Sequence, residues 1–376
     1  MHAVLFTDRG TSSMIRLLVR HGRRQGRILI AVASLALVAG CMACSPVYVV
    51  KAGIAEAGIL RARQPIHEVL NDSSVDAETR GKLAYVMEAR RFAAEELGID
   101  VGDSYTMFTQ LDRDTLAMVV TAAYPDRLVP KTWWFPIVGH VPYKGHFSLQ
   151  SALDEEASLA EDGYDTWVRP TAAFSTLGWF NDPILSTALR TDEVEVVTTV
   201  IHELSHQHLF VPGQITFNES FATFVGRVGA ARYFCTREVS GPDSVKCRRA
   251  LARWRDVQRF SSYLDDFVAR LETVYEDPDL TPDQKVVERL PVIVDALRDF
   301  DERVAPELEA LTFAGFRNQP VNNATLLSRI RYYNRLPEFG SFLARHDGDL
   351  VQALADLKER APQADDAFDL LTLPES

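Results

Sequence analysis

One short motif in the chain has clear chemical potential: residues 202–206 read His-Glu-Leu-Ser-His. Residues four apart share one face of a helix, with side chains about 6 Å apart, so His202 and His206 can bind one Zn²⁺. Zinc lowers the pKa of a water molecule that it holds toward about 7. Glu203 would lie beside that water and take its proton. The motif therefore predicts a zinc hydrolase with one zinc ion per chain and with Glu203 as the catalytic general acid/base.

A catalytic zinc ion needs a third protein ligand and an open position for water. The metzincin extension of the motif is excluded, because Leu209 and Pro212 stand where it requires glycine and histidine. Further on, residues 218–222 read Asn-Glu-Ser-Phe-Ala, which is the Asn-Glu-x-x-Ala pattern of a gluzincin carboxylate ligand. We predict Glu219 as the third metal ligand, in the first turn of a helix that begins there. Glu238 is the weaker alternative.

These residues must be positioned by helices. Asp192 is expected to cap a helix over residues 192–210, with Glu195 completing a capping box. Strand and helix patterns alternate in the first half of the chain, and helical patterns fill the second half. The sequence thus predicts an α+β fold, in which a small sheet with helices carries a zincin-like helix and a mostly helical C-terminal half follows. The expected strands are residues 115–124, 133–141 and 166–174. The other expected helices are residues 76–97, 148–162, 218–237, 248–275, 282–312, 322–333 and 349–360, with a capping box at 281–284.

The first 40 residues have the layout of a bacterial lipoprotein signal. A basic segment precedes a 12-residue apolar stretch that ends in small residues and then Cys41. We expect removal of the signal and lipidation of Cys41, a plain signal peptide being the alternative. The protein would then face the periplasm from a membrane of the bacterial cell envelope, the outer one rather than the inner. The expected parts are a signal (1–40), a tether and lead-in (41–75), a catalytic α+β part (76–247) and a helical part (248–376) that completes the same domain or forms a second.

Composition limits the partners. With 40 Lys and Arg against 52 Asp and Glu, the net charge is -12, which argues against nucleic acid as a ligand. Peptide is the expected substrate, and the oligomeric state is open.

Cys235 and Cys247 flank a Ser-Gly-Pro loop and would form a disulfide in an oxidising compartment. Two free thiols remain the alternative.

The sequence resembles the bacterial "predicted aminopeptidase" lipoprotein family, whose members are gluzincin-like zinc peptidases. The matching segments are RRFAAEELG (90–98), PKTWWFPIVGHVPYKGHF (130–147), AFSTLGWFNDPILST (173–187), HELSHQ (202–207), FNESFATFVG (217–226) and NNATLL (322–327). The resemblance implies a zinc hydrolase with His202, His206 and Glu219 as ligands and Glu203 as general acid/base. A zinc-dependent aminopeptidase is the expected function. A lipid-anchored zinc endopeptidase is one alternative, because the Gly-x-Met-Glu-Asn exopeptidase signature is absent. A non-catalytic envelope lipoprotein with a structural zinc site is the other.

Several side chains are candidates to donate a hydrogen bond to the oxyanion of the reaction. Residues 136–145 form an extended stretch that either pairs with a peptide backbone or makes a structural hairpin. The oxyanion candidates are His140, Tyr143, His146, Tyr332 and Tyr333.

Overall fold

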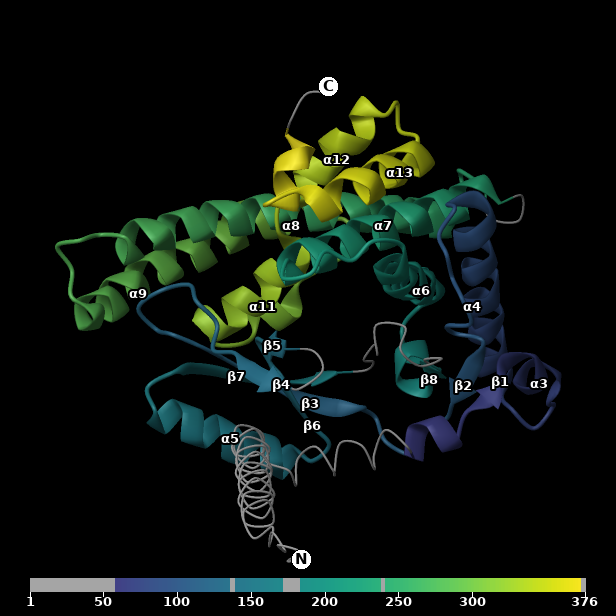
Figure 1. Cartoon of the computed structure of the whole chain (residues 1–376), viewed down its shortest axis with the longest axis horizontal. Helices are drawn as coiled ribbons and strands as arrows, with labels where there is room; N and C mark the ends of the chain where they lie inside the picture. Colours follow the sequence, from purple (N-terminus) through teal and green to yellow (C-terminus); the bar gives the residue numbers. More distant parts are fainter. Residues whose placement is uncertain (1–57, 136–138, 172–182, 238–240, 373–376) are drawn as a thin grey trace, which may run out of the picture. The chain divides into compact units, whose positions relative to one another are not determined.

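Short strands occupy the first half of the chain and long helices dominate the second (Figure 1). The computed structural model describes residues 58–135, 139–171, 183–237 and 241–372. This arrangement confirms the predicted α+β class and the mostly helical C-terminal half. The strands are β1 (Gln64–Pro65), β2 (Met107–Thr109), β3 (Ala117–Ala123), β4 (Trp133–Phe135), β5 (Gly139–Val141), β6 (Lys144–His146), β7 (Asp165–Thr171) and β8 (Ile184–Leu185). The helices are α3 (Ile66–Asn71), α4 (Ala77–Glu96), α5 (Leu149–Glu161), α6 (Glu193–His208), α7 (Ile215–Thr236), α8 (Val245–Tyr275), α9 (Pro282–Asp299), α10 (Ala314–Arg317), α11 (Asn323–Tyr333), α12 (Leu336–Arg345) and α13 (Leu350–Arg360).

The chain divides into two compact units. One comprises Met1–Ala55 with Trp134–His140, and the other comprises Glu56–Trp133 with Val141–Ser376. The predicted signal peptide, Cys41 and Glu238 lie outside the described residues.

The central sheet has three antiparallel strands in the order β6-β3-β7. Val120 of β3 is fully buried and pairs with Lys144 on one side and Val168 on the other. Helix α5 packs on β3 and β7, and α11 contacts the same two strands. Figure 1 shows α5 and α11 on opposite faces of this sheet. The sheet is therefore held between two helical layers, and α11 connects it to α7 and α8.

A second small sheet, β1-β2-β8, leads into the helical core. Its strand β8 pairs in parallel with β2 and passes through a short 3₁₀ turn, Ser186–Arg190, into α6. Ile66 and Val69 of α3 are buried against the main core, so packed structure begins within the segment expected to be a lead-in.

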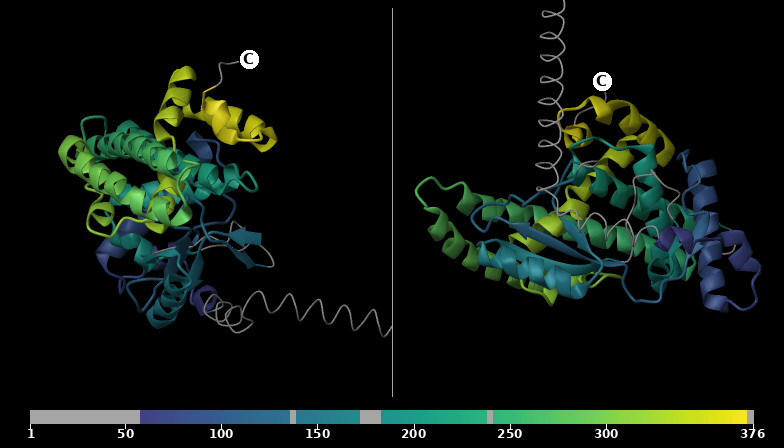
Figure 2. Two further views of the ribbon diagram at one scale, coloured as in Figure 1. Left: turned by 90° about the vertical axis from the view of Figure 1, so that its left-hand side faces the viewer. Right: turned by 60° about the horizontal axis from the view of Figure 1, so that its bottom comes forward.

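Helices α4, α6, α7 and α8 form the main core. Figure 2 shows α8 and α9 running side by side, where a second apolar cluster is built around Phe260, Phe267, Phe300 and Phe316. Among the described residues, no helix is both long enough and apolar enough to cross a membrane.

Several sequence-based boundaries need correction. The single strand expected over 133–141 is two short strands, β4 and β5. The helix expected to reach residue 312 ends at Asp299 and continues only as a π turn and a 3₁₀ turn to residue 307. Asp256, fully buried on α8, then accepts hydrogen bonds from the backbone N–H groups of residues 309–311, which holds that segment away from helical geometry. Helix α12 was not expected at all, whereas the capping box at 281–284 is confirmed.

Candidate metal centre

Helix α6 presents His202 and His206 on the face opposite its apolar one. Its buried residues include Val197, Ile201 and Leu204, each 0% exposed, which fix the rotation of the helix against the core. The side chain of Asp192 caps the helix by accepting a hydrogen bond from the backbone of Glu195 at 3.0 Å. Only this half of the predicted capping box forms, because the Glu195 carboxylate is engaged elsewhere.

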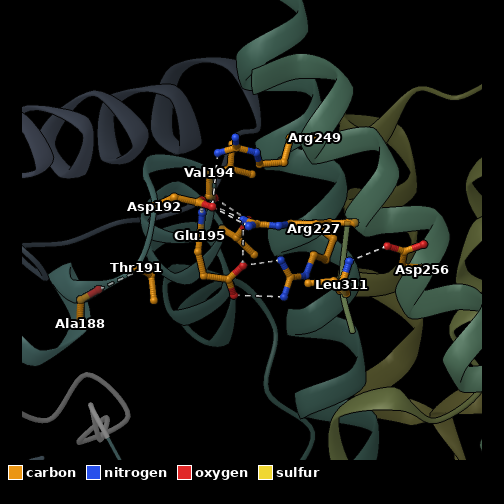
Figure 3. Close-up of polar contacts among 11 residues, drawn as sticks. Ala188, Thr191, Asp192, Val194, Glu195, Arg227, Arg249, Asp256 and Leu311 are labelled. Carbon is orange, nitrogen blue, oxygen red and sulfur yellow. Dashed lines mark hydrogen bonds and ion pairs between the residues drawn. The ribbon is translucent and has the colours of Figure 1, made fainter. Parts of the chain in front are cut away.

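That carboxylate ties α6 to α7. Arg227 donates two hydrogen bonds to Glu195, at 2.7 and 3.0 Å, as Figure 3 shows. Arg253 of α8 donates to both carboxylate oxygens of Asp192, at 2.8 and 2.5 Å, and Arg249 lies 3.4 Å from the same group. Bidentate arginine–carboxylate pairs fix orientation as well as distance. The N-terminal end of α6 is thus fastened to both neighbouring helices.

Two residues fix how closely α7 approaches the histidine face. A Cβ atom added to Gly226 would lie 2.8 Å from the Thr198 carbonyl oxygen and 3.0 Å from the His202 Cβ atom, so α7 can come this near only without a side chain there. Asn218, 2% exposed, bonds the Val211 backbone twice, since its Oδ1 accepts from the N–H at 2.8 Å and its Nδ2 donates to the C=O at 2.9 Å. The asparagine of the Asn-Glu-x-x-Ala pattern therefore holds the connection between α6 and α7 in place by these two hydrogen bonds.

The three predicted ligands converge. One ligand atom from each of His202, His206 and Glu219 lies within 4.8 Å of the other two. Glu219 Oε2 is 3.4 Å from His202 Nε2 and 3.7 Å from His206 Nε2. Helix α7 begins at Ile215, three residues earlier than expected, so Glu219 lies in its second turn. The short connection between the helices therefore suffices to bring the carboxylate onto the histidine pair.

The electrostatics of this cluster suit a cation. Burial lowers the pKa of His206 to about 4, so its imidazole is neutral and can act as a ligand at neutral pH. Burial raises the pKa of Glu219, but its hydrogen bond with His202 and its electrostatic interaction with the two histidines outweigh this and leave the pKa below its usual value. Burial lowers the pKa of His202, and its contacts with Glu219 and Glu203 reverse that effect. A buried carboxylate between two imidazoles thus stays ionised.

A cavity of about 280 Å³ opens beside the cluster. His202 and Glu203 line it from α6, so the predicted general acid/base faces the same space as one of the ligands. Helix α6 also contributes Glu195, Thr198 and Thr199 to the wall. The remaining walls come from β7, α7 and α11 and are formed by Trp167, Arg169, Thr223, Arg227, Ser328, Arg329, Tyr332 and Tyr333.

The oxyanion candidates separate into two groups. The Tyr332 ring stacks on the His202 ring with centroids 6.2 Å apart, and burial raises the pKa of Tyr332, with the Glu219 charge adding to the shift. Burial and the Glu219 charge likewise raise the pKa of Tyr143, so both phenols remain protonated donors. Both phenols therefore lie near Glu219, since its charge affects the pKa of each.

The other three candidates have different surroundings. His146 contacts the Ser151 hydroxyl at 3.2 Å and the Glu155 carboxylate at 3.9 Å, beside α5. Tyr333 lines the cavity but its ring also packs against Phe260, with centroids 5.3 Å apart. His140 is an exposed residue of β5 and belongs to the other unit.

Sequence reasoning missed the arginines around this site. Arg227 lies on a helix whose residues are buried almost throughout, and Arg169 lies on β7, and nothing in the neighbouring sequence of either residue indicates a site. Arg329 and Arg331 precede the two tyrosines in the segment Arg-Ile-Arg-Tyr-Tyr. These alternating arginines next to two tyrosines are the sequence feature that could have indicated a binding site here. Arg331 is 5% exposed and its guanidinium lies over the Tyr143 ring, 5.1 Å from the centroid.

At the far end of α7, Cys235 is joined to Cys247 of α8 by a disulfide, with Cα atoms 4.8 Å apart. This pairing connects the two helices across the loop that the sequence marked with Ser-Gly-Pro.

A family model described as "Putative aminopeptidase" matches residues 47–367. The chain belongs to this family. No significant match is found among curated proteins or solved structures. The family assignment covers both the metal-ligand cluster and the walls of the cavity, and it supports a peptidase at the level of the family name.

Proposed function

We propose that the protein is a zinc-dependent metallopeptidase that hydrolyses peptides, acting as an aminopeptidase. The observation that carries the proposal is the convergence of His202, His206 and Glu219 beside a cavity that Glu203 also lines. The family description supports the peptidase part.

The residues present fit a zinc ion. Zinc takes nitrogen and oxygen ligands at about 2.0–2.2 Å, and a tetrahedral arrangement then separates neighbouring ligand atoms by about 3.4 Å. The two contacts from Glu219, 3.4 Å to His202 and 3.7 Å to His206, match that spacing. Two imidazoles with one carboxylate suit zinc better than calcium or magnesium, which prefer oxygen ligands throughout.

Zinc held there would supply Lewis acidity toward water and the peptide carbonyl. Glu203, on the cavity wall next to His202, takes the proton of the attacking water and returns it to the leaving nitrogen. Tyr332 or Tyr143 donates a hydrogen bond to the carbonyl oxygen as its negative charge develops. Their raised pKa values keep both phenols protonated for this role.

A structural zinc site is less well supported. Such sites have four protein ligands, whereas the described residues bring only three metal-binding side chains together here. The placement of Glu203 beside the cavity also has a use in catalysis and none in a closed structural site.

The cellular setting remains part of the proposal. Lipidation of Cys41 would anchor the protein to the cell envelope with the peptidase facing the periplasm, in the outer membrane rather than the inner. Replacement of Cys41 by serine should move the protein from the membrane to the soluble fraction. A Cys41→Ser protein that fractionates with membranes as the unaltered protein does would contradict the anchor.

The roles of the two glutamates separate in one experiment. Glu203→Gln should keep one zinc per chain and lower peptide hydrolysis by about 10²–10⁴-fold, because it removes only the proton acceptor. Glu219→Gln should weaken zinc binding by about tenfold or more, with activity partly restored by added zinc. Glu161→Gln, on an exposed position of α5, is the matched control and should change neither quantity.

The measurements are zinc content by atomic absorption and hydrolysis of peptides with free and blocked amino ends. Loss of zinc from Glu203→Gln would show that its role is misassigned. Normal zinc binding by Glu219→Gln, together with loss from Glu238→Gln, would replace the ligand set. Cleavage that ignores a blocked amino end would favour an endopeptidase.

A further inference from the structure

The cavity beside the ligand cluster has an unusual charge distribution. Three arginines line it, from three different elements: Arg169 on β7, Arg227 on α7 and Arg329 on α11. Its two carboxylates are Glu195 and Glu203. Since Arg227 is bound by Glu195 through two hydrogen bonds, these two charges neutralise each other.

Arg169 and Arg329 are not neutralised in this way. Among the described residues, neither guanidinium lies within 4 Å of a carboxylate, and the hydrogen bond that Arg329 makes is to the Gly315 carbonyl oxygen at 2.9 Å. Both guanidinium groups lie near the Trp167 ring, at 5.9 and 5.1 Å from its centroid. Two arginines beside one aromatic ring, facing one cavity, form a cationic site that no carboxylate of the described residues approaches within 4 Å.

The same wall holds an unused hydroxyl. Ser328, 5% exposed, lines the cavity from α11, and its Oγ atom has no hydrogen-bond partner among the described residues. A buried polar atom without a partner costs free energy, so a substrate group that hydrogen-bonds to this hydroxyl would be stabilised by it. Burial lowers the pKa of Arg329, and the nearby charge of Arg169 lowers it further, so a bound anion would stabilise both guanidinium groups.

We propose that this cavity binds a carboxylate of the peptide substrate between Arg169 and Arg329, with the Ser328 hydroxyl as a further donor. The proposal rests on the proposed peptidase function and names its substrate class: peptides whose free α-carboxylate lies close to the scissile bond. An α-carboxylate is the last group of a peptide, so it lies on the side of the scissile bond that leaves as the amine. The small size of the cavity, below the roughly 300–1,000 Å³ of typical ligand pockets, suits a chain end rather than a long segment.

Binding of the substrate's amino end in this cavity is disfavoured. An α-ammonium group needs a carboxylate partner, and the two carboxylates of this cavity are engaged, Glu195 with Arg227 and Glu203 in proton transfer. Arg169 and Arg329 would also repel a cation. The amino end of the substrate must therefore be bound outside this cavity.

The test compares four peptides, each an alanine tripeptide with a free or acetylated amino end and a free or amidated carboxyl end. Among the peptides with a free amino end, the acid should be hydrolysed with kcat/KM at least about tenfold above the amide, since hydrogen bonds to charged groups are worth about 10–100-fold. The acetylated peptides should be poor substrates in both forms, as the proposed aminopeptidase activity requires. Arg169→Gln and Arg329→Gln should each remove most of this preference by raising KM for the acid far more than KM for the amide. Arg298→Gln, which breaks only an exposed ion pair on α9, is the matched control and should keep the preference.

A further pair of substrates identifies the source of the carboxylate. Amidated peptides that end in glutamate or glutamine differ only in a side-chain charge. Equal rates for the two are expected. Faster hydrolysis of the glutamate amide would show that the arginines bind an acidic side chain and would overturn the assignment to the α-carboxylate.

A binding measurement keeps the inference testable without turnover. Calorimetric titration with N-acetyl-alanine and with its amide should show tighter binding of the acid by the unaltered protein, and no such difference in Arg169→Gln or Arg329→Gln. Equal binding of acid and amide by the unaltered protein overturns the inference, even where zinc binding and hydrolysis follow the proposed function. Absence of hydrolysis with all peptides, together with a preserved arginine-dependent preference for the acid, would instead refute the peptidase function alone.

Discussion

Replacing Gly226 by alanine should spread α6 and α7 and weaken metal binding. The new Cβ atom would lie 2.8 Å from the Thr198 carbonyl oxygen, whereas ordinary contacts begin at 3.4 Å, so full relief requires a shift of about 0.6 Å. Metal ligands tolerate displacements of only about 0.2 Å. Because His202 and Glu219 sit on the two helices that separate, we expect zinc affinity to fall by about 10–100-fold, as for other residues that position ligands.

Two opposing effects set the stability of this variant. Alanine favours a helix over glycine by about 1 kcal/mol, whereas overpacking a close contact costs about 1–3 kcal/mol. The net loss in the free energy of unfolding without metal should therefore be between zero and about 2 kcal/mol. Gly81→Ala on α4 is the matched control, since nothing lies within 4 Å of its added Cβ atom. It should gain up to about 1 kcal/mol and leave zinc affinity unchanged.

The assays are competition for zinc against a coloured chelator and urea unfolding of the metal-free protein. If Gly226→Ala binds zinc within twofold of the unaltered protein, or is stabilised as much as Gly81→Ala, then this glycine does not set the helix separation and the reasoning is wrong.

Two further predictions concern α8. Asp256→Ala should lower the free energy of unfolding by about 3 kcal/mol or more in urea, because three backbone N–H groups of residues 309–311 lose their buried acceptor; a loss below about 1 kcal/mol would contradict that role. Burial raises the pKa of Asp265 to about 6, and the Glu338 charge adds to the shift. The folded protein therefore binds this proton more tightly than the unfolded chain does, and the stability that the protonated group contributes is lost as pH rises from about 4 to 6. Asp265→Asn should stabilise the protein above pH 6 by up to about 3 kcal/mol and change little below pH 4, which unfolding curves at several pH values will check.

The sequence was sufficient for features that depend on local pattern. Helix α6 begins at the residue after Asp192, as its cap predicts, and an apolar stripe fixes its buried face. The i, i+4 spacing of His202 and His206 needed no tertiary information. Glu219 required only the short connection that its own sequence neighbours form. Because these residues are near one another in the sequence, the local sequence pattern determines how they are placed in space.

Features that depend on distant contacts were not predictable in this way. The partner of Glu195 is Arg227 on another helix, and this pair prevents the second half of the capping box. The helix end at Asp299 depends on the backbone segment that Asp256 of α8 holds in place. The cavity walls also meet only in three dimensions, because Arg169 and Arg329 come from a strand and a helix far apart in the sequence.

The histidines and Glu219 are close in the sequence, whereas Arg169 and Arg329 are far apart, and this difference has a consequence for folding. The proposed metal ligands, His202, His206 and Glu219, come from adjacent helices, α6 and α7, whose pairing closes only a short loop. Contacts of this kind form early and at low entropic cost, whereas those between β7 and α11 require the whole unit to assemble. On the proposed function, a partly folded chain with a docked α6–α7 pair would therefore already hold a zinc ion before Arg169 and Arg329 come together. Damage to α11 would then abolish substrate selection in a protein whose metal content is normal, so zinc content alone is no measure of correctly folded enzyme.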